Sequence, residues 1–236
     1  MNVLKPKDLM QITRSSLPWL LVFCFIFFIC GICLALLFSP DDYKQGEIVR
    51  IMYIHVPTAW MSLAIYMLIA LLSFAFLVWN NVICSVLARA ASSVGMVFAA
   101  VCLITGSIWG KGTWGTWWVW DARLTSMLIL FFSYVGYLML WNFFSDEARA
   151  MKSASVFAIF SAINVPIVKF SVNLWSTLHQ PASILRAGGV AIDSSMLIPL
   201  IAMFIFFIFL FLVLWVLNSH KLIDTYKIKK EIVLRF

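Results

Sequence analysis

Charged residues are scarce in this sequence. Asp, Glu, Lys and Arg make up only 11% of its 236 residues, whereas hydrophobic residues make up 64%, and the mean hydropathy is +1.00. An average soluble domain carries roughly 25% charged residues, so this composition excludes an ordinary soluble protein. Several apolar runs are long enough to cross a bilayer, which indicates an integral membrane protein whose solvent is lipid.

Reactive groups and catalytic motifs are also few. All five cysteines lie in or at the edge of apolar runs, which gives no disulfide framework. Cys30 and Cys33 form a C-x-x-C, but a lipid-embedded helix disfavours the thiolate that redox chemistry requires. The sequence contains no phosphate-binding loop, no hydride-cofactor motif and no nucleophile paired with a base. We therefore expect a protein that is not an enzyme, and any ATP hydrolysis must come from a partner.

Six apolar runs predict six transmembrane helices. The expected spans are about 18–38, 57–79, 91–108, 124–144, 153–171 and 195–217. Pro57 is expected to open the second span, because proline is tolerated in a first helical turn. Apolar residues at helical spacing just before it predict a short amphipathic surface helix. The predicted fold class is an all-α integral membrane protein, with residues 1–236 forming a single membrane domain.

The distribution of Lys and Arg predicts the orientation in the membrane. An even number of spans places both termini on one side, where eleven Lys and Arg residues fall, against five on the opposite side. The positive-inside rule then makes both termini cytoplasmic. Three loops, at 39–56, 109–123 and 172–194, consequently share the outer face. In a bacterium this face is the periplasmic side of the inner membrane.

The stretch 109–125 reads WGKGTWGTWWVWDARLT and is the most unusual part of the chain. Five of the eleven tryptophans fall within twelve residues, interrupted by three glycines. Irregular backbone of this kind must lie outside the hydrocarbon, where its polar groups are satisfied. Interfacial aromatic belts place tryptophans near many helix ends rather than in one loop. The cluster therefore predicts a platform for a flat, apolar ligand.

Two histidines flank this loop on the predicted outer face. His55 precedes the second span and His179 lies in the last outer loop, whereas His220 falls in the cytoplasmic tail. Neutral imidazoles beside an aromatic platform suit an iron porphyrin, which needs axial nitrogen donors and apolar cover for its faces. Arg50 and Arg123 are the first candidates to bind its carboxylates.

Other interpretations of the same residues stay open. Arg186 and Lys169 are less direct candidates for the carboxylates, and Lys169 is also placed to extend its ammonium to the membrane surface. Asp121 either caps the fourth span or belongs to the site. His55, His179 and Asp121 could instead bind catalytic zinc, but a zinc site gives the tryptophans no purpose.

The tryptophan stretch resembles a known signature. W-G-x-x-W-x-W-D, present as Trp114, Gly115, Trp118, Trp120 and Asp121, is similar to the "WWD" motif of haem-handling membrane proteins in cytochrome c biogenesis. The haem lyase (CcmF) and CcsA-type synthetase branches typically continue with D-P and an acidic residue. This chain continues DARLTS, and also contains YIHVP, VKFSV and TLHQ, which resembles the CcmC (haem exporter protein C) family over most of its length.

The resemblance implies a function. In that family the outer loop and two flanking histidines bind haem and present it to the haem chaperone CcmE, which captures it covalently. The implied cofactor is haem b, with His55 and His179 as axial ligands of its iron. Trp114, Trp118, Trp120 and Asp121 would belong to the platform.

The resemblance also implies partners, namely the ABC ATPase CcmA with the membrane proteins CcmB and CcmD. Membrane lipid surrounds the chain, and no nucleic acid is expected. Three alternatives remain: a transmembrane haem permease, an enzyme that ligates haem to apocytochrome thiols, and a purely structural assembly subunit. The permease predicts polar residues near mid-membrane, which Asn164 and the break at Pro166 offer only weakly.

Overall fold

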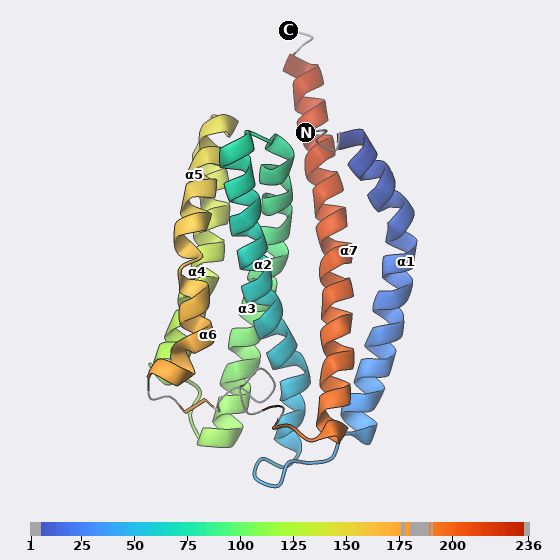
Figure 1. Ribbon diagram of the computed structural model, residues 1–236, viewed down its shortest axis with the longest axis vertical. Coiled ribbons are helices and arrows are strands. Elements are labelled where there is room, and N and C mark those ends of the chain that lie inside the picture. The colour runs from blue at the N-terminus through green and yellow to red at the C-terminus, as the bar shows by residue number, and fades with distance from the viewer. Residues whose placement is uncertain (1–5, 176–177, 180–188, 190, 234–236) are drawn as a thin grey trace.

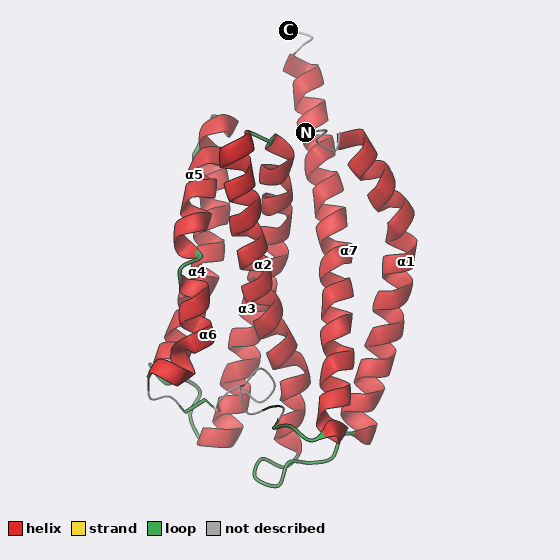
Figure 2. Cartoon of the chain, viewed as in Figure 1, coloured by secondary structure: helices red, strands yellow, loops and turns green. Residues whose placement is uncertain are grey.

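The computed structural model is a long helical bundle (Figures 1 and 2). It describes residues 6–175, 178–179, 189 and 191–233. Six helical segments in these ranges are long and apolar enough to cross a membrane. The predicted all-α, six-span fold class is thus confirmed. The regular elements are α1 (Pro6–Cys33) with a π-helical turn (Leu34–Phe38), a 3-10 helix (Glu47–Ile51), α2 (Met52–Trp79), α3 (Val82–Trp114), α4 (Ala122–Phe143), α5 (Glu147–Ser161), α6 (Asn164–Leu174) and α7 (Ser194–Val233).

The two ends of the bundle differ in what they carry. α1 begins and α7 ends at one end, which we call the terminal end (Figure 1). The connections 39–46 and 115–121 lie together at the other, which we call the loop end. The segments predicted to share the outer face therefore share one end of the bundle, as far as they are described.

The second helix begins earlier than the sequence predicts. α2 starts at Met52, so Pro57 is its sixth residue, and the 3-10 helix leads into it without a break. Val49 is buried, and Ile48 packs so closely on α3 that a Cβ at Gly112 would lie 1.8 Å from its Cδ1. The predicted surface helix is therefore an entry turn of α2, because its apolar side packs on protein.

The third helix extends into the tryptophan stretch. α3 continues to Trp114 and ends at Gly115, whose φ of 77° is left-handed and favours glycine. The Gly115 N–H donates to the Lys111 carbonyl at 3.2 Å, and Lys111 Nζ donates to the Gly115 carbonyl at 3.0 Å. Within the stretch 109–125, only residues 115–121 are irregular. The prediction of a loop from 109 was wrong for residues 109–114, because Gly110 and Gly112 lie within α3 and Gly112 packs against Ile48.

The fifth span is broken into α5 and α6 at residues 162–163. Pro166 has no N–H to donate back to Ala162, which weakens the helix at this point. Asn164 secures the second half, since its Nδ2 donates to the Ser126 carbonyl of α4 at 2.8 Å. As a result α6 is a short helix that is joined to the loop-end half of α4.

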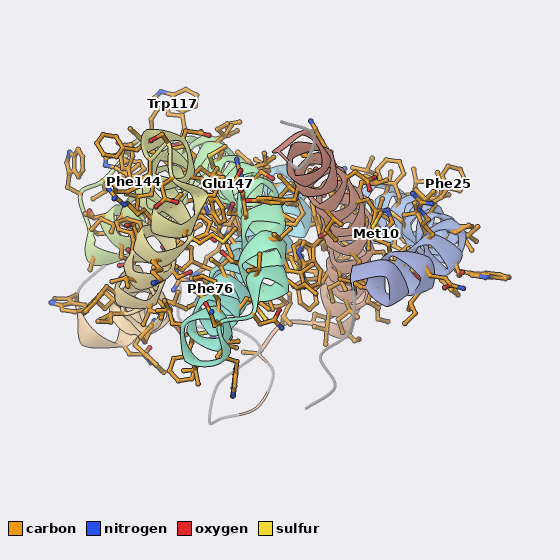
Figure 3. The ribbon with its side chains drawn as sticks, turned by 90° about the horizontal axis from the view of Figure 1, so that it is seen from above. Met10, Phe25, Phe76, Trp117, Phe144 and Glu147 are labelled. Carbon is orange, nitrogen blue, oxygen red and sulfur yellow. The ribbon has the colours of Figure 1, made fainter. Side chains whose placement is uncertain are left out.

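The core lies among α2, α3, α4 and α5, with α7 between this group and α1 (Figures 1 and 3). Tyr66, Tyr134 and Tyr137 are completely buried in it. The Tyr134 hydroxyl donates to the Ser62 carbonyl at 2.6 Å, and a Cβ at Gly95 would lie 2.4 Å from the Tyr134 hydroxyl. α1 packs mainly on α7 and presents Phe25 at the edge of the molecule (Figure 3).

Candidate functional site

A cavity of about 630 Å³ lies at the loop end of the bundle. Ligand pockets in proteins commonly measure roughly 300–1,000 Å³. Its lining comes from residues 40–45, from α2, α3, α4, α6 and α7, and from the connection before α7. Along α2 the lining runs from Met52 to Trp60, and along α3 from Gly106 to Trp114. At 1.5 Å per residue this gives a depth of roughly 12 Å, enough for an extended ligand to enter edgewise.

His55 of α2 lines this cavity with a defined tautomer. Its Nδ1 lies 3.0 Å from the Cys102 carbonyl and 3.2 Å from the Thr105 hydroxyl. That hydroxyl already donates to the Val101 carbonyl at 2.6 Å, and a carbonyl can only accept. Nδ1 must therefore carry the proton and donate. Nε2 keeps its lone pair and makes no hydrogen bond within the described part of the chain.

The α3 surface beneath His55 is shaped to the imidazole ring. A Cβ at Gly106 would lie 2.8 Å from His55 Cε1, so only glycine leaves room for the ring as placed. Trp109 meets the ring edge-on, with centroids 5.6 Å apart and planes at 77°. The Trp109 Nε1 donates to Gln45 Oε1 at 2.7 Å, which ties this wall to residues 40–45. Cys102, Gly106 and Trp109 recur at helical spacing, a signal that the sequence contains but does not by itself connect to His55.

His179 reaches the same cavity from the connection between α6 and α7. Its ring lies against Trp114, with centroids 5.1 Å apart and planes at 59°. Burial, together with the nearby charge of Arg123, lowers the pKa of His179 to about 4, while the negative charge of Asp121 opposes the shift. At neutral pH the imidazole is consequently uncharged, which is the form that coordinates a metal.

Arg123, one of the two first candidates for the ligand carboxylates, lines the cavity. It lies in the first turn of α4 and is half-buried. The structure shows no ion pair of its side chain with any described residue. A guanidinium in this position offers a fork of donors to a carboxylate entering the cavity.

Asp121 performs one role that can be seen directly. It is the N-cap of α4, and its Oδ1 accepts from the Leu124 N–H at 2.8 Å. The side chain is not part of the cavity lining. Its charge still acts on His179, as the pKa of that histidine indicates. The cap therefore explains the backbone position of Asp121, and the two roles left open by the sequence can coexist.

The tryptophans separate into two groups. Trp109 and Trp114, at the end of α3, line the cavity. Trp118 and Trp120 lie outside the lining and contact each other edge-on, with centroids 5.5 Å apart. Trp120 is 76% exposed, and Trp117 projects from the edge of the bundle (Figure 3). Of the tryptophans predicted to form a platform, Trp114 lines the cavity, whereas Trp118 and Trp120 lie outside its lining, Trp118 half-buried and Trp120 exposed.

Sequence comparison now identifies the family. The family profile described as "CcmC: Heme exporter protein C" matches residues 1–234. The chain belongs to the CcmC family. It is 46% identical over 213 residues to "Heme exporter protein C" of Bradyrhizobium diazoefficiens, covering 90% of this chain and 81% of that protein. It is 41% identical over 195 residues to the Escherichia coli K12 protein of the same name, covering 83% and 78%.

The similarity extends beyond bacteria. A "Putative cytochrome c biosynthesis ccmC-like mitochondrial protein" of Marchantia polymorpha is 43% identical over 212 residues, covering 90% of both chains. The membership agrees with the resemblance drawn from the WWD motif and from the segments around His55 and His179.

Arg50 occupies a different position from Arg123 in this CcmC family member. Its Nη2 pairs with Asp41 Oδ1 at 3.1 Å, and Asp41 rather than Arg50 lines the cavity. The predicted contact of Arg50 with a ligand carboxylate would require the ion pair with Asp41 to open. Arg186, the other outer-loop candidate, lies outside the described residues.

Several lining residues were not singled out from the sequence. Thr113 of α3 has a buried hydroxyl without a hydrogen-bond partner among the described residues. Trp60, Gln45 and Asn173 also line the cavity. Lys169, which the sequence offers as a less direct candidate for a ligand carboxylate, lines it as well. Thr113, Trp60, Gln45 and Asn173 come from α3, α2, the connection before the 3-10 helix and α6, so no local spacing in the sequence unites them.

Proposed function

We propose that this CcmC family member binds haem b in the loop-end cavity and delivers it to the haem chaperone CcmE during c-type cytochrome biogenesis. The observation that carries the proposal is the pair of neutral imidazoles at one cavity. Nε2 of His55 is left free by its fixed tautomer, and His179 is uncharged at neutral pH. Family membership supports the ligand, since the relatives are named heme exporter proteins.

The remaining lining suits a porphyrin. Trp109 and Trp114 supply apolar, polarisable surface at the two histidines, as the contacts of their rings with the imidazoles indicate. Arg123 supplies a donor for a carboxylate. When bound, haem would bring an iron centre with axial coordination positions, and the chain would contribute the nitrogen donors, the apolar walls and the cation.

Delivery requires a site from which the cargo can leave. The cavity lies at the loop end of the bundle, and the irregular segment 115–121 at the same end exposes the indoles of Trp117 and Trp120. Exposed aromatic side chains are typical anchors in protein recognition. We infer that this segment receives CcmE on the periplasmic side of the inner membrane, and that CcmA, CcmB and CcmD complete the complex.

The alternatives receive less support from the fold. A permease needs a path through the terminal half of the bundle, where the core is filled by Tyr66, Tyr134 and Tyr137. A zinc site would use Asp121, whose Oδ1 instead caps α4. Among the described residues no group of three or more metal-binding side chains gathers. The cavity is thus better suited to a ligand that needs two nitrogen donors.

The test is the absorption spectrum of the purified full-length chain after haem supply in the presence of its partners. Wild type should show a haem Soret band, and His55→Ala and His179→Ala should each change its position or abolish haem retention. Asn218→Ala, a substitution in α7 far from the loop end, is the control and should retain the band. A wild-type protein without haem, or unchanged spectra in both histidine variants, would disprove the axial assignment.

A further inference from the structure

Lys169 faces the cavity although it belongs to a membrane-spanning segment. It lies on α6, where Val172 and Asn173 also line the cavity. These three positions share one face of a helix, at spacings of three and four residues. Val172 and Asn173 are one turn closer to the loop end than Lys169, so the cavity continues past the level of the lysine. The Lys169 side chain therefore forms part of the cavity lining, about one helical turn below the rim of the cavity.

The break between α5 and α6 sets the depth of this lysine. The Asn164 side chain donates to the Ser126 carbonyl, which brings these two residues to the same level on neighbouring helices. α4 runs away from the loop end and α6 runs toward it. Arg123 is three residues from Ser126 and Lys169 is five residues from Asn164, both on the loop-end side. At 1.5 Å per residue, the two residues differ in depth by only roughly 3 Å.

Two cations thus line one side of the cavity at nearly the same depth. The structure shows no ion pair or hydrogen bond of the Lys169 ammonium with any described residue, and none of the Arg123 guanidinium. Arg123 is half-buried and lies near the charge of Asp121, whereas Lys169 is exposed, so a carboxylate that enters the cavity can reach the lysine. A ligand with two negative groups along one edge would neutralise both charges.

We propose that Lys169 is a carboxylate-binding residue of this site and, together with Arg123, selects a ligand that carries two carboxylates on one edge. The inference rests on the proposed function, for which haem with its two propionates is such a ligand. Arg50, by contrast, is already neutralised by Asp41. Contacts of Lys169 and Arg123 with the two carboxylates would fix one orientation of the ligand. Its carboxylate edge would lie at α4 and α6, and its opposite edge would lie toward residues 40–45.

The experiment compares two ligands on the purified full-length protein, namely haem and haem dimethyl ester, whose carboxylates are blocked. Lys169→Met should lower the affinity for haem about 10-fold, the usual size of a charge-assisted hydrogen bond, and leave the affinity for the diester within about twofold. Lys169→Arg should restore most of the affinity for haem. Lys152→Met is the matched control, because Lys152 lies on α5 outside this cavity, and it should bind both ligands as wild type does.

Each other outcome has a distinct meaning. Equal losses for haem and diester in Lys169→Met would show a structural role, and unchanged binding of both would show a lysine directed to the membrane surface. Either result overturns the inference. A wild-type protein that prefers neither ligand also overturns it but leaves haem binding intact. A wild-type protein that binds neither ligand overturns the proposed function itself.

Discussion

At the scale of single residues, the site depends on how His55 is held. One nitrogen donates to the Cys102 carbonyl and the other is free toward the cavity. Gly106 provides the space in which the ring lies, and Trp109 limits its rotation from the side. A ligand nitrogen that is orientated in advance loses little freedom on coordination. The precision of this position comes from α3 rather than from α2, which carries the histidine.

Gly106→Ala tests this arrangement. The added Cβ would lie 2.8 Å from His55 Cε1 and force the ring to move. Because axial coordination depends on direction, we expect haem affinity to fall by about 10-fold or more, as for loss of other supports of a metal ligand. The measurement is a haem titration followed by absorbance.

Ser107→Ala is the neighbouring control on the same helix, since Ser107 is not part of the cavity lining. It should bind haem as wild type does. Thermal unfolding of both variants separates a local displacement of the ring from a general loss of folding. Wild-type affinity in Gly106→Ala would show that the ring position seen here is not required.

At the scale of elements, short irregular segments determine where the functional side chains lie. The 3-10 turn before α2, the left-handed Gly115 after α3 and the break before α6 each redirect the chain at the loop end. Asp121 is a further example, since its cap fixes the start of α4 and hence the position of Arg123 two residues later. The cap and the position of Arg123 are therefore coupled through the geometry of one helix terminus.

Substitutions at Asp121 separate the two roles left open by the sequence. Asp121→Asn keeps a capping oxygen, and we expect stability close to that of wild type. Asp121→Ala removes the cap and should lower the free energy of unfolding by about 1 kcal/mol. If Asp121 acts only as a cap, Asp121→Asn should bind haem normally. Loss of haem by a stable Asp121→Asn protein would instead show that its negative charge is part of the site, and thermal unfolding with haem titration distinguishes these outcomes.

At the scale of the whole molecule, the two halves of the bundle differ in character. The terminal half is a packed core with buried tyrosines, whereas the loop half contains the cavity. α7 continues to Val233, well past the predicted end at 217, and α1 rests mainly against it. This division suits a protein that holds its cargo at one membrane surface. The exposed indoles at that surface remain available to a partner.

The two groups of tryptophans should therefore behave differently. Trp114→Ala removes the ring against His179 and should lower haem affinity several-fold. Trp120→Ala removes an exposed ring outside the cavity lining and should leave haem affinity within about twofold while slowing transfer to CcmE. Haem titration measures the first effect, and covalent loading of purified CcmE measures the second. Equal loss of haem affinity in both variants would mean that the outer indoles also cover the ligand.

The six-span architecture, the grouping of His55, His179 and the tryptophan stretch at one end, and the family can all be predicted from the amino-acid sequence. Hydropathy and motif residues are properties of contiguous segments, so they can be read without a fold. Which cations and indoles line the cavity depends on how the helices pack, because Arg123, Lys169 and Trp114 come from three helices. The tertiary structure also revealed the fixed tautomer of His55 and the ion pair of Arg50, since both depend on partners from other parts of the chain.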